Sequence, residues 1–379
     1  MKILLVGEYS RLHNSLKEGL LQHGHEVILL GTGDGFKNFP TDITITDTLF
    51  SKPYFKTIAK AFHKVFNIQL IELEYYNKLK KIIPTLKDFD VVQLINEQSF
   101  KTSPNREIQL VTQLLKQNRS VFLLSCGTDY TSVKYALDKK FHYSILTPYF
   151  EDISLKKHYR FILKYVSKPY KKLHDFLFSN VKGVIASDFD YHIPLKGNSK
   201  YLGLIPNPIN TDKIKYKPLK ISNKVIIFHG INRMNYIKKG NRFFEEALDI
   251  IKNKYSDKVD IVVAENLPYQ EYIKAFDSCH ILLDQVYAYD QGYNALEAMA
   301  KGKVVFTGAE KEWLDYYNLR ENTVAINALP DTNDIVSKLE WLIENPSMIL
   351  EISKNARAFI DSEHNYIRIS EQYLKIWSN

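Results

Sequence analysis

The residues best suited to chemistry lie in the stretch DQGYNALEAMAKGKVVFTG (290–308). Its pattern predicts a loop, then Gly292 at the start of a short helix that carries Glu297, then a buried strand. The free N–H groups and the dipole at such a helix start bind anions, and a glycine lets a phosphate approach the backbone closely. The carboxylate of Glu297, little more than one turn further on, would accept hydrogen bonds from hydroxyls of a sugar attached to that phosphate. The alternative is an acidic residue that only stabilises the first helical turn through the dipole.

A second stretch, FHGINRMNYIKKGNRFFEEAL (228–248), places cations after another predicted strand. Gly230 lies at the end of that strand, and Arg233 and Lys239 follow in the loop before the next helix. Parallel strands end at the same edge of a sheet, so these two cations would face the anion site and neutralise a diphosphate. Lys238 stands beside Lys239, which leaves the choice of lysine open. A solvated basic loop is the alternative.

The elements that must position these residues are strands alternating with helices. The runs KILLVG (2–7), SVFLLSCG (120–127) and KVIIFHGI (224–231) are typical of parallel strands covered on both faces. The alternation occurs twice, on either side of a Pro-, Asn- and Lys-rich linker at 203–224. The sequence therefore predicts two doubly wound α/β domains that face each other across a central cleft. The first turn, VGEYSRLHNSL, lacks G-x-G-x-x-G, which disfavours a redox dinucleotide enzyme.

Composition narrows the class of protein. The chain has 379 residues, 45% of them hydrophobic, and a formal net charge of +8. This length favours two domains, and no run approaches the length of a membrane-spanning segment. The first residues, MKILLVGEYS, are typical of a buried strand rather than a signal peptide. Cys126 and Cys279 are the two cysteines, which excludes a disulfide framework and favours a cytoplasmic location.

Lysines and aromatic residues interleave in SLKKHYRFILKYVSKPYKKLHDFLF (154–178). One interpretation is a solvated helix in a lysine-rich chain. The other is a basic amphipathic face in the region Lys156–Lys172 that contacts anionic lipid or a lipid-linked acceptor, with the protein peripheral on the cytoplasmic face of the membrane. No recognition motif accompanies the charge, so we expect no nucleic-acid partner.

Three motifs resemble the retaining GT-B glycosyltransferases of the GT4 family (glycosyl transferases group 1). IPNPINTDKI (205–214) resembles the family's I-P-N-G-V-D-x-x-x-F hinge, and GINRMNYIKKG (230–240) resembles its G-R-x(5)-K-G loop. YDQGYNALEAMAKGKVV (289–305) resembles E-G-F-G-x-x-x-x-E-A-M-A-x-G-x-P-V. The resemblance implies a GT-B fold of two Rossmann-like domains. Residues 1–205 would form the acceptor domain, completed by a crossing C-terminal helix at 362–379, and residues 206–361 would form the nucleotide-sugar donor domain.

The resemblance also implies residue roles. Arg233 and Lys239 would hold the donor diphosphate and stabilise the leaving group, because charge builds on the departing phosphate in the transition state. Glu297 would accept hydrogen bonds from the nucleotide ribose. The segment ENLPYQEYIKAF (265–276) resembles the part of the family that reads the base with its backbone. The further donor-binding residues implied are Gly230, Asn266, Leu267, Gly292, Tyr293 and Asn294.

Some positions depart from the family pattern. Tyr289 occupies the position of the first of two family glutamates, and Asp290 beside it is a substitute partner for sugar hydroxyls. Cys126 stands where a histidine commonly precedes glycine, on the acceptor side. Asp129 is the nearest carboxylate for positioning the acceptor, which makes it a third catalytic candidate, with helix capping as the alternative role. His13 would contact acceptor or donor if it faces the cleft, and would otherwise be a surface residue.

Together these features imply a bacterial glycosyltransferase that moves a sugar from a nucleotide-diphosphate sugar to a glycan or lipid-linked acceptor. The resemblance implies retention of configuration and a place in surface polysaccharide or glycoconjugate synthesis. Because the two cations would replace a divalent ion, we expect no metal and no cofactor. Two alternatives stay open: a non-catalytic nucleotide-sugar-binding protein of the same fold, and a GT-B sugar-nucleotide epimerase.

Overall fold

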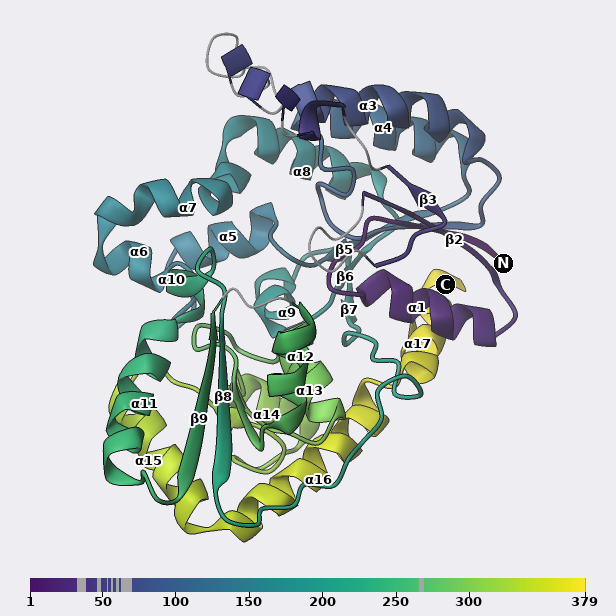
Figure 1. Ribbon diagram of the computed structural model, residues 1–379. Helices are drawn as coiled ribbons and strands as arrows, with labels where there is room; N and C mark the ends of the chain where they lie inside the picture. The colour runs from purple at the N-terminus through teal and green to yellow at the C-terminus, as the bar shows by residue number, and fades with distance from the viewer. Residues whose placement is uncertain are drawn as a thin grey trace.

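In a computed structural model, the chain forms two parallel β-sheets, each with helices on both faces (Figure 1). The structure describes residues 1–379 apart from 33–38, 46–48, 53, 56, 59–60, 63–69, 266–268 and 379. All strand pairings between neighbouring strands of the described residues are parallel. The prediction of two doubly wound α/β domains is therefore confirmed.

The first sheet has the strand order β3-β2-β1-β4-β5-β6-β7. Successive side chains of its central strand β1 point to opposite faces. Ile3 and Leu5 therefore pack on α1, whereas Leu4 and Val6 pack on the other side, against α3 and α4. The strands are β1 (Lys2–Val6), β2 (Glu26–Gly31), β3 (Ile43–Thr44), β4 (Val91–Leu94), β5 (Val121–Ser125), β6 (Val184–Ala186) and β7 (Tyr201–Leu204).

Helices of the first half cover this sheet and extend beyond it. Figure 1 shows α3, α4 and α8 above the sheet, and α5, α6 and α7 as a separate group beside it. The α-helices are α1 (Leu12–Gln22), α3 (Leu70–Ile82), α4 (Pro104–Gln117), α5 (Tyr130–Leu137), α6 (Thr147–Glu151), α7 (Lys156–Leu163), α8 (Lys168–Asn180) and α9 (Phe189–Leu195). The 3-10 turns are η2 (Leu49–Ser51), η3 (Ile83–Thr85), η4 (Ile153–Leu155) and η5 (Lys164–Val166).

The second sheet has the order β12-β11-β10-β8-β9. Its strands are β8 (Val225–Ile231), β9 (Val259–Glu265), β10 (Ile281–Leu283), β11 (Val304–Thr307) and β12 (Ile326–Asn327). Ile227 on β8 packs with α11 and α15, whereas Phe228 beside it packs with α12 and α13. The helices are α10 (Tyr236–Lys239), α11 (Asn241–Lys254), α12 (Tyr269–Ser278), α13 (Tyr293–Ala300), α14 (Lys311–Tyr317), α15 (Thr332–Glu344), α16 (Pro346–Glu363) and α17 (Tyr366–Ser378).

The chain passes between the two sheets twice, and the two crossings run side by side. On the outward crossing, the Ile209 amide donates to the His364 carbonyl at 2.7 Å, and the Tyr366 amide on the return crossing donates to the Ile209 carbonyl at 3.1 Å. The last helix, α17, then packs against α1 of the first sheet (Figure 1). Gly19 permits this contact, because a Cβ there would lie 2.3 Å from the Tyr366 carbonyl oxygen.

Candidate active site between the two sheets

Lys239 and the start of α13 meet at one carboxylate. Lys239 Nζ lies 2.8 Å from Asp284 Oδ1, and Asn294 Nδ2 donates to the same oxygen at 2.9 Å. Asp284 directly follows β10, and its side chain is 1% exposed. The structure therefore brings a cation from one predicted motif to the helix start of the other, at the carboxyl ends of β8 and β10.

Gly292 precedes α13 with φ −70° and ψ 167°, a conformation open to any residue. A Cβ here would have the Gln285 side chain as its nearest neighbour, at 3.6 Å. The backbone is therefore approachable at this point, where the first N–H groups of α13 have no partner within their own helix. With Lys239 close by, this helix start can hold an anion.

Glu297, on the next turn of α13, lines a cavity of about 420 Å³ together with Asn294 and Tyr272. We call it the lysine-lined cavity, because cations make up much of its wall. Asp277, a second carboxylate of the wall, is paired with Lys301. The cations of this lining suit a polyanion, and the carboxylate of Glu297 suits a polar group attached to that polyanion. The cations are Arg11, Lys213, Lys215, Lys217, Lys301 and Lys303.

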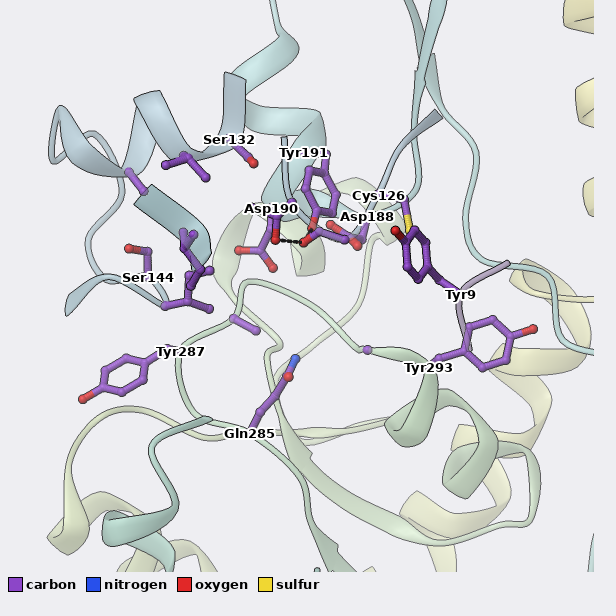
Figure 2. Close-up of a pocket in the computed structure, with 18 of the residues that line it drawn as sticks. Tyr9, Cys126, Ser132, Ser144, Asp188, Asp190, Tyr191, Gln285, Tyr287 and Tyr293 are labelled. Carbon is purple, nitrogen blue, oxygen red and sulfur yellow. Dashed lines mark hydrogen bonds between the residues drawn. The ribbon is translucent and has the colours of Figure 1, made fainter. Parts of the chain in front are cut away.

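An interdomain cavity of about 390 Å³ lies on the other side of the α13 start (Figure 2). Figure 2 shows Tyr9, Cys126 and Asp188 from the first domain opposite Gln285 from the second. The predicted donor-binding residues are therefore divided. Gly292 and Tyr293 line the interdomain cavity, whereas Asn294 and Glu297 line the lysine-lined cavity.

Two tyrosines of the second domain extend into the first. The hydroxyl of Tyr289 accepts a hydrogen bond from the His142 amide at 2.9 Å. The hydroxyl of Tyr293 lies 2.9 Å from that of Ser15 on α1 and donates to the Pro208 carbonyl in the first crossing. Burial raises the pKa of both phenols, that of Tyr289 to about 12. Both side chains contact the first domain, and the backbone of Tyr293 begins α13, where an anion would bind.

Arg233 and Lys239 contact different carboxylates, Glu265 and Asp284. The Nε and Nη2 of Arg233 donate to the two carboxylate oxygens of Glu265 at 2.7 and 2.6 Å, and Arg233 lines neither cavity. The two residues meet because the register of β8 and β9 pairs Ile231 with Glu265. The Arg233 side chain is 47% exposed. Exposed ion pairs contribute little, so a ligand phosphate can compete with Glu265 for the guanidinium.

Gly230 has a packing role beside this loop. A Cβ there would lie 2.8 Å from the ring of Tyr272. Because the position is glycine, the ring reaches across β8, and its hydroxyl donates to Asn294 Oδ1 at 3.3 Å. Gly230 thus acts on the site through Tyr272 and Asn294.

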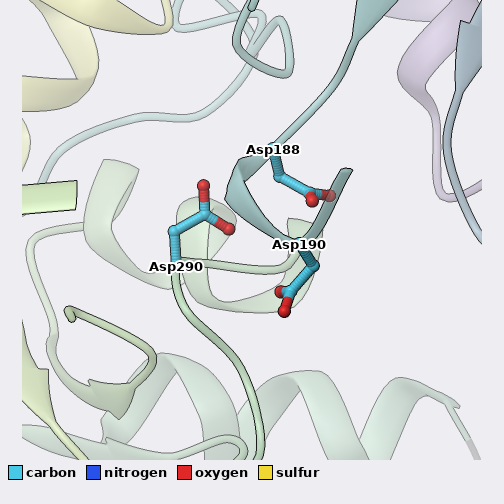
Figure 3. Close-up of side chains that lie close together, drawn as sticks. All are labelled: Asp188, Asp190 and Asp290. Atoms are coloured by element: carbon cyan, nitrogen blue, oxygen red, sulfur yellow. The ribbon is translucent and has the colours of Figure 1, made fainter. Parts of the chain in front are cut away.

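Asp290 belongs to a cluster of three carboxyl groups at the domain contact, with Asp188 and Asp190 (Figure 3). One carboxylate oxygen from each lies within 4.8 Å of the others. Asp290 Oδ2 accepts from the Phe189 amide at the start of α9 at 3.0 Å. Burial and the neighbouring carboxyl groups raise the pKa of Asp290 and of Asp188 well above their usual range, and burial raises that of Asp190 to about 7. The three carboxyl groups therefore titrate as one coupled set.

The first-domain candidates take different positions. Asp129 caps α5, where it accepts from the Ser132 amide at 2.7 Å and from the Ser125 hydroxyl, so the capping alternative describes its contacts. His13 is fully buried, its Nδ1 lies 2.7 Å from the Gly7 carbonyl oxygen, and burial lowers its pKa to about 4. Cys126 lines the interdomain cavity, and burial raises the pKa of its thiol.

Some site residues had no place in the sequence-based prediction. Asp284 and Gln285 follow β10 and hold or face the α13 start. Asp188 and Asp190 form a D-x-D pattern after β6, and that pattern is the signal that could have identified them. The predicted base-reading residues Asn266 and Leu267 lie outside the described residues.

One family model matches the second domain of the chain. Residues 234–375, which contain Lys239, Asp284 and Glu297, match the family model described as glycosyl transferase-like. No curated protein matches the chain significantly.

Solved structures show the fold over the whole chain. The chain resembles a sucrose-phosphate synthase from Thermosynechococcus elongatus at 14% identity and a TM-score of 0.62, with 100% of this chain and 98% of that one covered. It resembles HepE from Anabaena in complex with UDP and glucose at 13% identity and a TM-score of 0.61, with both chains covered completely. A putative UDP-N-acetylglucosamine 2-epimerase from Listeria monocytogenes matches at 11% identity and a TM-score of 0.51, covering 99% and 95% of the chains.

These similarities define the fold of the protein. The chain has the GT-B fold, with two Rossmann-like domains that meet at the site described above. Residues 234–375, in its second domain, match the glycosyl transferase-like family model. The resemblance seen in the sequence motifs is therefore confirmed for the GT-B fold and for the family match in the second domain.

Proposed function

We propose that this protein transfers a sugar from a nucleotide-diphosphate sugar to a glycan or lipid-linked acceptor. The observation that carries the proposal is the Lys239–Asp284–Asn294 contact, since it fixes a cation at the helix start whose next turn bears Glu297. The donor diphosphate would bind at the α13 start, with the nucleoside in the lysine-lined cavity. The sugar would then point into the interdomain cavity.

Lys239 and the α13 amides would stabilise the negative charge that develops on the departing phosphate. Asp284 is a positioning residue in this scheme, because it holds the ammonium group in place without touching the donor. Glu297 would accept hydrogen bonds from the ribose hydroxyls. Arg233 would join the diphosphate after leaving Glu265. The reaction would proceed with retention, as the motif resemblance implies, and without a divalent ion, because the two cations would take its role.

Structural neighbours support the nucleotide-sugar part of the proposal. HepE has been solved in complex with UDP and with UDP-glucose. A nucleotide-diphosphate ligand of the same chemistry suits the cations of the lysine-lined cavity and the hydroxyl-accepting Glu297. Reaction in the cytoplasm, in surface polysaccharide or glycoconjugate synthesis, is part of the same proposal.

A thermal-shift screen of UDP-, GDP- and ADP-sugars tests the proposal. A ligand at one hundred times its Kd stabilises the folded state by about 2.7 kcal/mol. We expect one base series to raise Tm, and slow hydrolysis of the matching donor to free sugar and nucleoside diphosphate. If none of the three series raises Tm, the donor proposal is wrong.

A non-catalytic nucleotide-sugar-binding protein is the second candidate. It is favoured by the contacts of two predicted catalytic residues: Asp129 caps α5, and Arg233 is held by Glu265. Binding of a donor without hydrolysis or transfer across a broad acceptor panel would favour this candidate over the enzyme.

A further inference from the structure

Residues 151–172 form an exposed basic face at the outer edge of the first domain, which we call the α7 face. It comprises η4, α7, η5 and the start of α8, and Figure 1 shows α7 on the outside of the helices that flank the first sheet. Two large apolar side chains stand out from it, Ile153 at 70% and Phe161 at 60% exposure. Ile153 lies in η4 just before α7, and Phe161 lies on α7 itself. A second group of exposed apolar residues lies at Leu49, Tyr54, Ile58 and Phe62.

The helix α7 has two opposite faces. Tyr159 and Ile162 are buried against α5 and the loop that follows it. At 3.6 residues per turn, positions spaced by three, four and seven residues share one face, so Lys157, Arg160 and Phe161 lie together on the side away from this core. Lys164, immediately after α7, places its Nζ 4.6 Å from the centroid of the Phe161 ring. The exposed side is therefore an aromatic ring surrounded by cations.

The charge of the α7 face is not balanced within the fold. Residues 151–172 include seven Lys or Arg and two Asp or Glu. Glu151 faces Arg242 of the second domain at 3.8 Å, and Asp152 caps η4. Lys171 pairs with Asp175. Among the described residues, the other six of these seven cations make no ion pair within 4.0 Å, and Lys164 donates to the neutral Gln98 side chain instead. The remaining five are Lys156, Lys157, Arg160, Lys168 and Lys172.

A bilayer with anionic headgroups complements both features of this face. Cations bind the headgroups, and an apolar residue between them inserts at the boundary with the acyl chains. A nucleic acid would satisfy the charge but would leave Ile153 in water. None of the described helices is long and apolar enough to span a bilayer. Contact with a membrane would therefore be made by a surface such as this one.

The α7 face also lies next to the interdomain cavity. Ile162, adjacent to Phe161, lines that cavity from the inner side of α7. Val133, Ala136 and Leu146 form the apolar wall around it. A helix with its side chains is about 10 Å across, so lipid at Phe161 would be about one helix diameter from the cavity.

We propose that the α7 face docks the protein on an anionic membrane surface, with Phe161 and Ile153 inserted among acidic headgroups. Resting on the proposed function, this placement favours the lipid-linked class of acceptor over a free glycan. The apolar wall of the interdomain cavity then receives the part of the acceptor nearest its lipid anchor.

Co-sedimentation of the full chain with vesicles tests the proposal. We expect binding to vesicles of phosphatidylcholine with one quarter phosphatidylglycerol, weak binding to phosphatidylcholine alone, and release by high salt. The variant Lys157→Gln/Arg160→Gln should bind about thirtyfold more weakly, since two headgroup contacts are lost. Phe161→Ser should also weaken binding. Matched controls are Lys252→Gln/Lys258→Gln for charge and Leu350→Ser for an exposed apolar residue, all in the second domain, and these should bind as the native chain does.

Three results would overturn the proposal: no preference for anionic vesicles, equal loss in the control variants, or tighter binding to a single-stranded RNA oligomer than to the vesicles at the same salt. The last would assign the face to nucleic acid. Nucleotide-sugar thermal shifts measured on the same preparations separate the two proposals. A chain that responds to a nucleotide sugar but ignores anionic vesicles refutes the membrane docking alone, and the reverse result refutes the donor proposal alone.

Discussion

Replacing Lys239 by alanine should damage both the fold and donor binding, and the structure allows the two effects to be separated. The variant leaves the Asp284 carboxylate buried at 1% exposure with Asn294 as its remaining side-chain partner. Removing one partner of a buried pair costs about 3–5 kcal/mol. Because Lys239 is itself 31% exposed, the lower end, about 3 kcal/mol, is the better expectation.

The double variant Lys239→Ala/Asp284→Asn removes the uncompensated charge together with the cation. Its free energy of unfolding, measured by urea titration, should return most of the way to the native value. Donor affinity and transfer should stay at least tenfold below native, because the diphosphate still lacks its cation. Lys238→Ala, which changes the adjacent lysine, is the matched control and should keep both properties.

Two results would refute this reasoning. If the double variant regained donor affinity along with stability, Lys239 would be only the counter-ion of Asp284. If Lys238→Ala proved the more damaging change, the motif alignment that selected Lys239 would be wrong.

Three further predictions concern other parts of the site. Glu297→Gln should weaken binding of the free nucleoside diphosphate by about 1.5–3 kcal/mol with folding intact, and unchanged affinity in calorimetry would make Glu297 a structural helix residue. Arg233→Ala should lower transfer at least tenfold but leave Tm unchanged, and a nucleotide complex that still shows Arg233 on Glu265 would contradict its diphosphate role. Asp190 has a pKa of about 7, raised from 3.8, so its contribution to stability is present at acid pH and is lost as the pH rises through 7. The free energy of unfolding should therefore fall by no more than about 4 kcal/mol as the pH rises from about 4 to 7, Tm should fall with it, and Asp190→Asn should flatten that fall.

The fold was predictable because most of its strands are continuous apolar runs. The run KILLV forms β1, with both faces buried. The short helix predicted to carry Glu297 forms α13. Strands β3 and β12 are two residues long, too short to show any period. Strand β7 ends with Gly203 and Leu204, the first two residues of the predicted linker. Gly203 and the exposed Leu202 interrupt the apolar pattern, so the sequence does not show this strand.

The candidate site was predictable where its residues are neighbours in the sequence. It was not predictable where residues that are far apart in the sequence come into contact. Glu297 and Gly292 belong to one local motif, and the motif fixes their spacing. The bond between Tyr293 and Ser15 joins residues 278 positions apart, so no local pattern carries it. Likewise Gln93 on β4 accepts from the Trp377 indole of the last helix at 3.1 Å, a partner known only once the chain is folded.

The paired crossings between the domains have a mechanical consequence. The two backbone segments that cross between the domains are paired at Ile209 and Asn365, and together they define one hinge axis. We expect any relative movement of the two domains to be a rotation about that axis. Any such rotation must break the contacts that Tyr289 and Tyr293 make with the first domain. In such a rotation, the width of the interdomain cavity would depend on one angle between the domains. The contacts of the two tyrosines would hold that angle at the value seen in this structure.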